Sequence, residues 1–142
     1  MSDKAYKEKS RDYIVTYTKK LFNPLSPNKK DIVIEDIAHA LSLLSRANGH
    51  SETFYSVAQH SLNCAYEAKA RGYNNRIQLA CLLHDGSEAY IGDVTRPFKK
   101  HLTFYLEVED KMQDLIWDTL GVKELSEAES EQVFSIDDDV LF

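Results

Sequence analysis

His84 and Asp85, an imidazole and a carboxylate, are adjacent in the sequence and directly follow an apolar stretch of the chain. Adjacent residues on a helix point about 100° apart, so both side chains can reach one ion that lies between their directions. His60 lies on the expected helix before the one that leads to this doublet. Glu88 and Asp93 follow the doublet closely. A further acidic cluster lies near the end of the chain, at Asp137, Asp138 and Asp139. These residue types in this order favour a site for a divalent metal ion.

The donor set would consist of His60, His84, Asp85 and one of the late aspartates, which together offer two neutral nitrogens and two anionic oxygens. Imidazole with carboxylate suits Mn²⁺, Co²⁺, Fe²⁺ or Zn²⁺, whereas all-oxygen sites suit Mg²⁺. The identity of the ion stays open, Mg²⁺ included. Such a site would leave positions for water and for a phosphate oxygen. The alternative for each histidine taken alone is a hydrogen-bonded core residue.

The two cysteines, Cys64 and Cys81, each lie among apolar residues of expected helices. We expect both to be small buried side chains. Cys81 and His84 do form a C-x-x-H spacing, which is half of a zinc motif. The sequence contains no second half, so a buried thiol is the preferred interpretation.

Helices must position most of these residues. Apolar residues recur with helical period in four stretches, and short strand-like runs occur at 13–17 and 32–34, the latter also able to begin a helix. The predicted helices cover residues 35–46, 56–71, 105–120 and 125 to the end, with a further helix capped by Asn74 or Asn75. In the helix over 56–71 the apolar face is expected at Val57, Leu62 and Ala65, with Cys64 as a further candidate. The fold class is therefore all-α, a bundle of five to six helices with at most a small β ribbon near the N-terminus.

Length and charge narrow the classes of function. A chain of 142 residues predicts one core domain over residues 32–142, with residues 1–31 as an N-terminal extension packing on it. The net charge of −6 argues against a polymeric nucleic acid or a membrane surface as partner. No run of about 18 apolar residues is present, and the charged N-terminus lacks the apolar core of a signal peptide. We therefore expect a cytoplasmic protein.

The order His60, His84-Asp85 and a distant Asp resembles the H…HD…D pattern of the HD-domain metal-dependent phosphohydrolases. Residues 84–100, HDGSEAYIGDVTRPFKK, resemble the bacterial 5′-deoxynucleotidase branch, in which a Glu and an Asp follow the doublet as Glu88 and Asp93 do here. The stretches IEDIAHALSLLSRANGH and YSVAQHS are similar to phage and bacterial HD hydrolases. The resemblance covers roughly residues 32–142.

The resemblance implies a role for each matching residue. His60, His84, Asp85 and a C-terminal Asp would bind the metal. Asp137 is our choice, because the ligand in related sequences usually follows an apolar or small residue, as Asp137 follows Ile136. Asp138 is the second choice, and Asp139 stays open.

Glu88 and Asp93, the two acidic residues that follow the doublet, would take part in catalysis. Glu88 would position the attacking water or take its proton, if the helix continues one turn past Asp85. Asp93 would act near the sugar or the leaving oxygen. Their structural alternatives are a surface carboxylate at a helix end for Glu88 and a turn cap for Asp93.

Three cations are candidates for substrate binding. Arg46 matches an Arg that holds the phosphate in the nucleotidase branch, and its alternative is a partner for the helix dipole. Arg96 and Lys99 are secondary candidates for phosphate or base contacts. Ala47 stands where those relatives carry Trp, so their nucleotide preference does not transfer directly. His39 is expected to be structural, and the role of His50 stays open.

The resulting hypothesis is a metal-dependent hydrolase of a nucleoside or deoxynucleoside 5′-monophosphate, with a small-molecule nucleotide as partner. Hydrolysis of a nucleoside triphosphate or of a signalling nucleotide is the alternative within the class. The alternative outside it is a non-catalytic module in which the metal joins helices or the fold senses a nucleotide. The resemblance also implies a homodimer. The sequence ends five residues after Asp137, so a minimal pocket or a wall completed by a second subunit is expected.

Overall fold

A computed structural model describes the protein at residue 4 and at residues 11–141. Over these residues the chain is mostly helical, with one two-stranded antiparallel ribbon, so the predicted fold class is confirmed. The ribbon pairs β1 (Ile14–Val15) with β2 (Leu21–Phe22). The longer helices are α2 (Ile34–Leu43), α3 (Val57–Ala70), α4 (Asn75–Leu83), α7 (Thr103–Thr119) and α8 (Glu127–Asp139). The short helices are η1 (Lys29–Asp31), η2 (Arg46–Gly49), α5 (Glu88–Ile91) and α6 (Arg96–Lys99).

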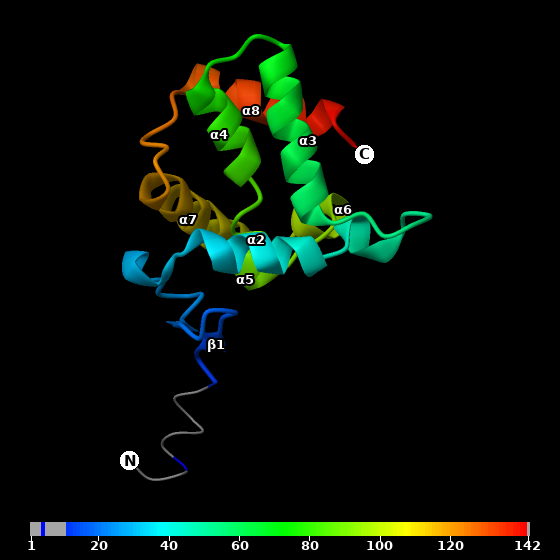
Figure 1. Cartoon of the computed structure of the whole chain (residues 1–142). Helices are drawn as coiled ribbons and strands as arrows, with labels where there is room; N and C mark the ends of the chain where they lie inside the picture. Colours follow the sequence, from blue (N-terminus) through cyan, green and yellow to red (C-terminus); the bar gives the residue numbers. More distant parts are fainter. Residues whose placement is uncertain (1–3, 5–10, 142) are drawn as a thin grey trace.

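The helices enclose a core with two apolar clusters. One cluster joins α3, α4, α7 and α8 through residues such as Ala80, Trp117 and Ile136. The other joins β2, α2, α5 and α7, and in it the rings of Phe22 and Tyr90 stack with centroids 3.8 Å apart. In Figure 1, α3 and α4 stand side by side and α8 crosses behind them. α3, α4 and α8 therefore pack together, which brings residues of all three helices close to one another.

Side-chain caps fix where three of these helices begin. Ser56 accepts a hydrogen bond from the backbone N–H of Gln59 at the start of α3, and Asn74 accepts one from Ile77 at the start of α4. Ser126 and Glu129 form a capping box at the start of α8. Each such cap stabilises a helix by about 1 kcal/mol. Of the two asparagines considered from the sequence, Asn74 is the cap.

The first long helix is shorter than predicted. α2 ends at Leu43, and Leu44 is extended because its carbonyl accepts a hydrogen bond from the N–H of Val57 at 2.9 Å. Ser45 forms a bridge with Ser56, and the N–H of Arg46 donates to Tyr55 at 2.7 Å. The prediction of a helix through Arg46 was wrong, because this segment pairs with the chain entering α3. Arg46 therefore does not serve the dipole of α2.

The buried face of α3 also differs from the prediction. Val57 is buried as expected, but Leu62 is 41% exposed and Ala65 is only partly covered. The face that points inward carries His60, Ser61 and Cys64. The apolar pattern was misleading here because polar side chains occupy the inner face. α3 therefore buries polar, chemistry-bearing groups together with Val57 and Ala68.

The N-terminal extension predicted over residues 1–31 lies partly outside the described residues. In the described part, the backbone N–H and the hydroxyl of Thr18 donate to the carboxylate of Asp36 at 2.7 and 3.0 Å. Phe22 is fully buried. No helix in the described part of the chain is long and apolar enough to cross a bilayer.

Candidate metal centre

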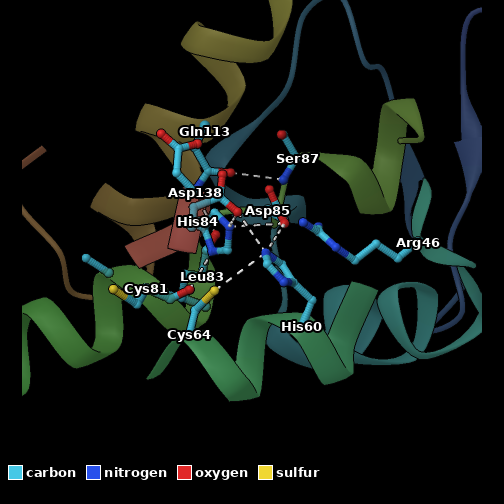
Figure 2. A network of polar contacts seen from close by, with 12 residues as sticks. Arg46, His60, Cys64, Cys81, Leu83, His84, Asp85, Ser87, Gln113 and Asp138 are labelled. Atoms are coloured by element: carbon cyan, nitrogen blue, oxygen red, sulfur yellow. Dashed lines mark hydrogen bonds and ion pairs between the residues drawn. The ribbon is translucent and has the colours of Figure 1, made fainter. Parts of the chain in front are cut away.

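Side chains from three helices meet at one buried point. His60 lies on α3, His84 directly follows α4, and Asp137 lies in the last turn of α8. One ligand atom from each of these residues, and the Sγ of Cys64, all lie within 4.8 Å of one another. Figure 2 shows His60, Cys64, His84 and Asp85 pointing toward a common centre. We call His60, Cys64, His84, Asp85 and Asp137 the metal cluster.

The two carboxylates of the cluster contact both imidazoles. Asp137 Oδ1 lies 2.7 Å from His60 Nε2 and 3.1 Å from His84 Nε2. Asp85 Oδ2 lies 3.1 Å from His84 Nε2 and 3.9 Å from His60 Nε2. The structure thus brings together all four residues that the sequence suggested as ligands.

The three candidate aspartates of the C-terminal run are placed differently. The side chain of Asp137 is 17% exposed, and it follows Ile136, which is fully buried. Asp138 and Asp139 are mostly exposed and form ion pairs with Arg96 and Arg71. Of these three carboxylates, therefore, the one that reaches the imidazoles is that of Asp137.

The hydrogen bonding of His84 tests whether a cation fits the cluster. Its Nδ1 lies 2.6 Å from the carbonyl oxygen of Cys81, so Nδ1 must carry the proton and donate it there. In the neutral ring, Nε2 then presents a lone pair toward two carboxylate oxygens. Burial lowers the pKa of His84, but the charges of Asp85 and Asp137 outweigh it and raise the pKa to about 10. The cluster therefore favours positive charge at Nε2, which either a proton or a bound cation could supply.

The carboxylates are poised to be anionic ligands. Burial raises the pKa of Asp137, but its contacts with His60 and His84 are stronger and hold the pKa well below its usual value. Burial likewise raises the pKa of Asp85, and His84 lowers it to a greater extent. Both groups therefore remain ionised at neutral pH and offer the oxygen donors that such an ion prefers.

These shifts predict that stability depends on pH in the metal-free protein and not in the metal-loaded protein. A pKa of His84 raised to about 10 in the folded state contributes stability that is complete below pH 6.5 and is lost as the pH rises toward 10. The unfolding free energy of chelated protein should therefore fall over this range, by a few kcal/mol in order of magnitude. A bound divalent ion replaces the proton and should abolish the fall. Urea unfolding at several pH values, with and without chelator, measures this, and identical profiles would contradict it.

Cys64 is the member of the cluster that sequence reasoning missed. Its Sγ lies 3.5 Å from His60 Nε2, and the residue is 1% exposed. Burial and the nearby Asp137 and Asp85 raise the pKa of this thiol. The available signal was the spacing of four residues from His60, which places both side chains on one helical face. Cys81, by contrast, contacts the site through its backbone carbonyl group, which accepts the hydrogen bond from His84 Nδ1.

Hydrogen bonds tie the end of α4 to α7 and hold the His84-Asp85 segment in place. Gln113 donates to the carbonyl of Leu83 at 2.8 Å and accepts from the N–H of Ser87 at 3.1 Å (Figure 2). At Gly86 an added Cβ would lie 3.0 Å from the Leu83 carbonyl and 3.1 Å from Ile116. A glycine is therefore needed for α7 to approach so closely behind Asp85.

A cleft of about 360 Å³ opens on one side of the metal cluster. Asp85 and Asp137 form part of its wall. The remaining walls include all five residues predicted for catalysis or substrate binding, namely Arg46, Glu88, Asp93, Arg96 and Lys99. A larger cleft of about 790 Å³ adjoins it. Arg96 and Lys99 line both clefts, and His84 lines the larger one. The residues predicted for catalysis and substrate binding thus line one cleft beside the metal cluster.

Glu88 reaches this cleft by a turn rather than by a continuous helix. α4 ends at Leu83, and the N–H of Glu88 donates to the carbonyl of Asp85 at 3.0 Å as α5 begins. The expectation that one helix runs through both residues was therefore wrong. Glu88 is 5% exposed, and burial together with the charges of Asp85 and Asp93 raises its pKa well above the usual value. Glu88 therefore holds a proton more readily than an exposed carboxyl group does.

The three cations of the cleft already have partners in the chain. Arg46 points toward the cluster (Figure 2), and its Nε donates to the carbonyl of Leu141 at 3.3 Å. Arg96 pairs with Asp137 at 3.1 Å, and Lys99 pairs with Glu109 at 2.6 Å. An anion entering the cleft would therefore share these cations with the protein's own acceptors. The other early histidines lie elsewhere, since His39 stacks on Tyr17 and His50 lines neither cleft.

Two curated proteins are similar to this chain, while no protein-family profile matches it. The uncharacterized protein YfdR of Escherichia coli (strain K12) is 37% identical over 110 residues, which cover 78% of this chain and 59% of YfdR. An uncharacterized protein of Rhodobacter capsulatus is 43% identical over 94 residues, which cover 62% of this chain and 47% of that protein. The chain thus spans about half the length of these relatives. Neither relative's name states an activity.

Proposed function

We propose that this protein is an HD-domain phosphohydrolase that uses a divalent metal ion to hydrolyse nucleoside or deoxynucleoside 5′-monophosphates. One observation supports it above the others: the two imidazoles and two carboxylates of the predicted pattern converge at the wall of a cleft that is also lined by three cations. The resemblance of residues 84–100 to the 5′-deoxynucleotidase branch supports the choice of substrate class.

Each group of the cleft has a role in the proposed reaction. A bound divalent ion would polarise a phosphoryl oxygen and lower the pKa of the attacking water. His60, His84, Asp85 and Asp137 would hold the ion. Arg46 would bind the phosphate, because a planar guanidinium offers paired donors to two phosphoryl oxygens. Arg96 and Lys99 would add positive charge as the phosphate displaces their acidic partners.

Glu88 and Asp93 would take part in proton transfer during the reaction. Hydrolysis of a phosphate monoester moves a proton from the attacking water to the oxygen of the leaving alcohol. Glu88 has a pKa raised well above the usual value, and it lines the same cleft as Asp93. Glu88 would give its proton to the leaving oxygen and regain one from the attacking water, which keeps the proton count unchanged, and Asp93 would act beside the leaving oxygen.

A panel of nucleotides assayed for phosphate release with Mn²⁺, Co²⁺, Zn²⁺ and Mg²⁺ tests the proposal. We expect orthophosphate release from nucleoside 5′-monophosphates, abolished by chelator and restored by at least one of these ions. Release of triphosphate or pyrophosphate from nucleoside triphosphates would replace the proposal with the triphosphate alternative. Metal-dependent thermal stability without turnover of any nucleotide would overturn the enzymatic role and support a structural metal.

A further inference from the structure

The metal cluster contains one more donor than the four-residue pattern requires. His60, His84 and Asp137 belong to both of the four-donor groups that can be drawn in it. The fourth donor is the oxygen of Asp85 in one group and the sulfur of Cys64 in the other. These two ligands differ in kind, since a carboxylate suits hard ions and a thiolate suits Zn²⁺, Co²⁺ and Fe²⁺.

The position of Cys64 agrees with metal–ligand geometry. In a tetrahedral site with Zn–N and Zn–S bonds of ordinary length, the nitrogen and the sulfur lie about 3.6 Å apart. Cys64 Sγ lies 3.5 Å from His60 Nε2. The same nitrogen contacts Asp137 Oδ1 at 2.7 Å, so the nitrogen, the sulfur and the carboxylate oxygen lie close together. An ion bound to His60 Nε2 and Asp137 would therefore lie within reach of the sulfur without movement of α3.

Cys64 and Asp85 approach the cluster from different sides. Asp85 lines both clefts, whereas Cys64 lines neither and is 1% exposed. The sulfur thus occupies the protein side of the cluster, and the carboxylate occupies the side that opens to the cleft. A solvent-shielded sulfur would leave the positions that face the cleft free for water and substrate.

We propose that Cys64 is a thiolate ligand of this metal centre and that it makes the site selective for Zn²⁺, Co²⁺ or Fe²⁺ over Mn²⁺ and Mg²⁺. Coordination releases the thiol proton to solvent and forms a metal–sulfur bond. The inference rests on the metal centre of the proposed function and is independent of the reaction and of the substrate.

The test is a cobalt titration of the metal-free protein followed by absorption spectroscopy. Cobalt bound to thiolate gives an intense charge-transfer band in the near ultraviolet, which nitrogen and oxygen ligands do not produce. We expect the band in the wild-type protein and its loss in Cys64→Ala and Cys64→Ser. Affinity for Co²⁺ should fall by at least about 10-fold in these variants, whereas affinity for Mn²⁺ should change by less than about 3-fold.

Cys81→Ala is the matched control, because Cys81 is the other free cysteine and is also buried, but its thiol lies outside the cluster. This variant should keep both the band and the wild-type affinity. A wild-type protein that binds Co²⁺ without the band, or a band that persists in both Cys64 variants, would overturn the sulfur ligand and leave the metal centre intact. A wild-type protein that binds no Co²⁺ would overturn the metal centre and the sulfur ligand together. The wild-type spectrum decides the question even if a Cys64 variant fails to fold.

Discussion

Asp137→Asn is expected to lower the turnover rate and metal affinity more than any change outside the metal cluster. The substitution keeps the size of the side chain but removes the anionic oxygen that contacts His60 and His84 at 2.7 and 3.1 Å. Loss of a metal ligand should lower metal affinity at least about 100-fold. Loss of the charge stabilisation that the ion provides, about 4 kcal/mol, should lower the turnover rate about 1000-fold. Calorimetric metal titration and phosphate-release kinetics measure the two effects.

The neighbouring residue provides the control for this experiment. Asp138→Asn removes the same charge one position later, from a mostly exposed side chain whose partner is Arg96. We expect less than about a 3-fold change in metal affinity, as for other exposed ion pairs. Equal losses in Asp137→Asn and Asp138→Asn would show that bulk charge near the C-terminus, and not ligation, determines binding.

Glu88→Gln is expected to separate catalysis from metal binding. Its carboxyl group is buried, has a pKa raised well above the usual value and lines the smaller cleft. An amide keeps the shape but cannot transfer a proton, so kcat should fall about 100-fold. Metal affinity and the cobalt spectrum should remain at wild-type values. In the pH profile of kcat, the limb that reports this acid should disappear.

Glu107→Gln is a suitable control, since Glu107 is an exposed carboxylate on α7 that lines neither cleft. It should leave kcat and KM unchanged. If Glu88→Gln lost metal affinity in proportion to its loss of kcat, Glu88 would act on the metal centre instead of on the proton transfer.

The helical architecture was predictable because long amphipathic stretches and their caps are local signals. α7 and α8 begin within about two residues of where the apolar period places them, which is the usual precision of such boundaries. The end of α2 was not predictable in this way. Leu44 leaves the helix to pair with the N–H of Val57, a contact between segments that sequence period does not report.

The convergence of His60, His84 and Asp85 followed from residue types and spacing, combined with family resemblance. The choice among Asp137, Asp138 and Asp139 depended on a weak local cue, the buried Ile136 before Asp137. The cleft required three-dimensional information, because Arg46, Glu88 and Lys99 come from separate segments. No periodic pattern relates those segments to one another.

Cys64 shows how the usual interpretation of a buried cysteine can hide a candidate metal ligand. A lone cysteine on an amphipathic helix is usually a small apolar residue. The inner face of α3 was assigned by hydropathy, which favoured Leu62 and overlooked the polar side chains of His60 and Ser61. A search for donor residues four apart on one helix would have paired His60 with Cys64.

The distance along the chain between the first and last ligands has a consequence for how the protein is made. His60 and Asp137 are separated by 77 residues. Ribosomes add about 5–20 residues per second, so the nascent polypeptide carries both imidazoles for several seconds before Asp137 exists. An ion held by all four residues would therefore reach its full coordination only after Asp137 had been added. Such an ion would join segments that lie far apart in the sequence, and the entropy of closing the loop between them grows only slowly with its length.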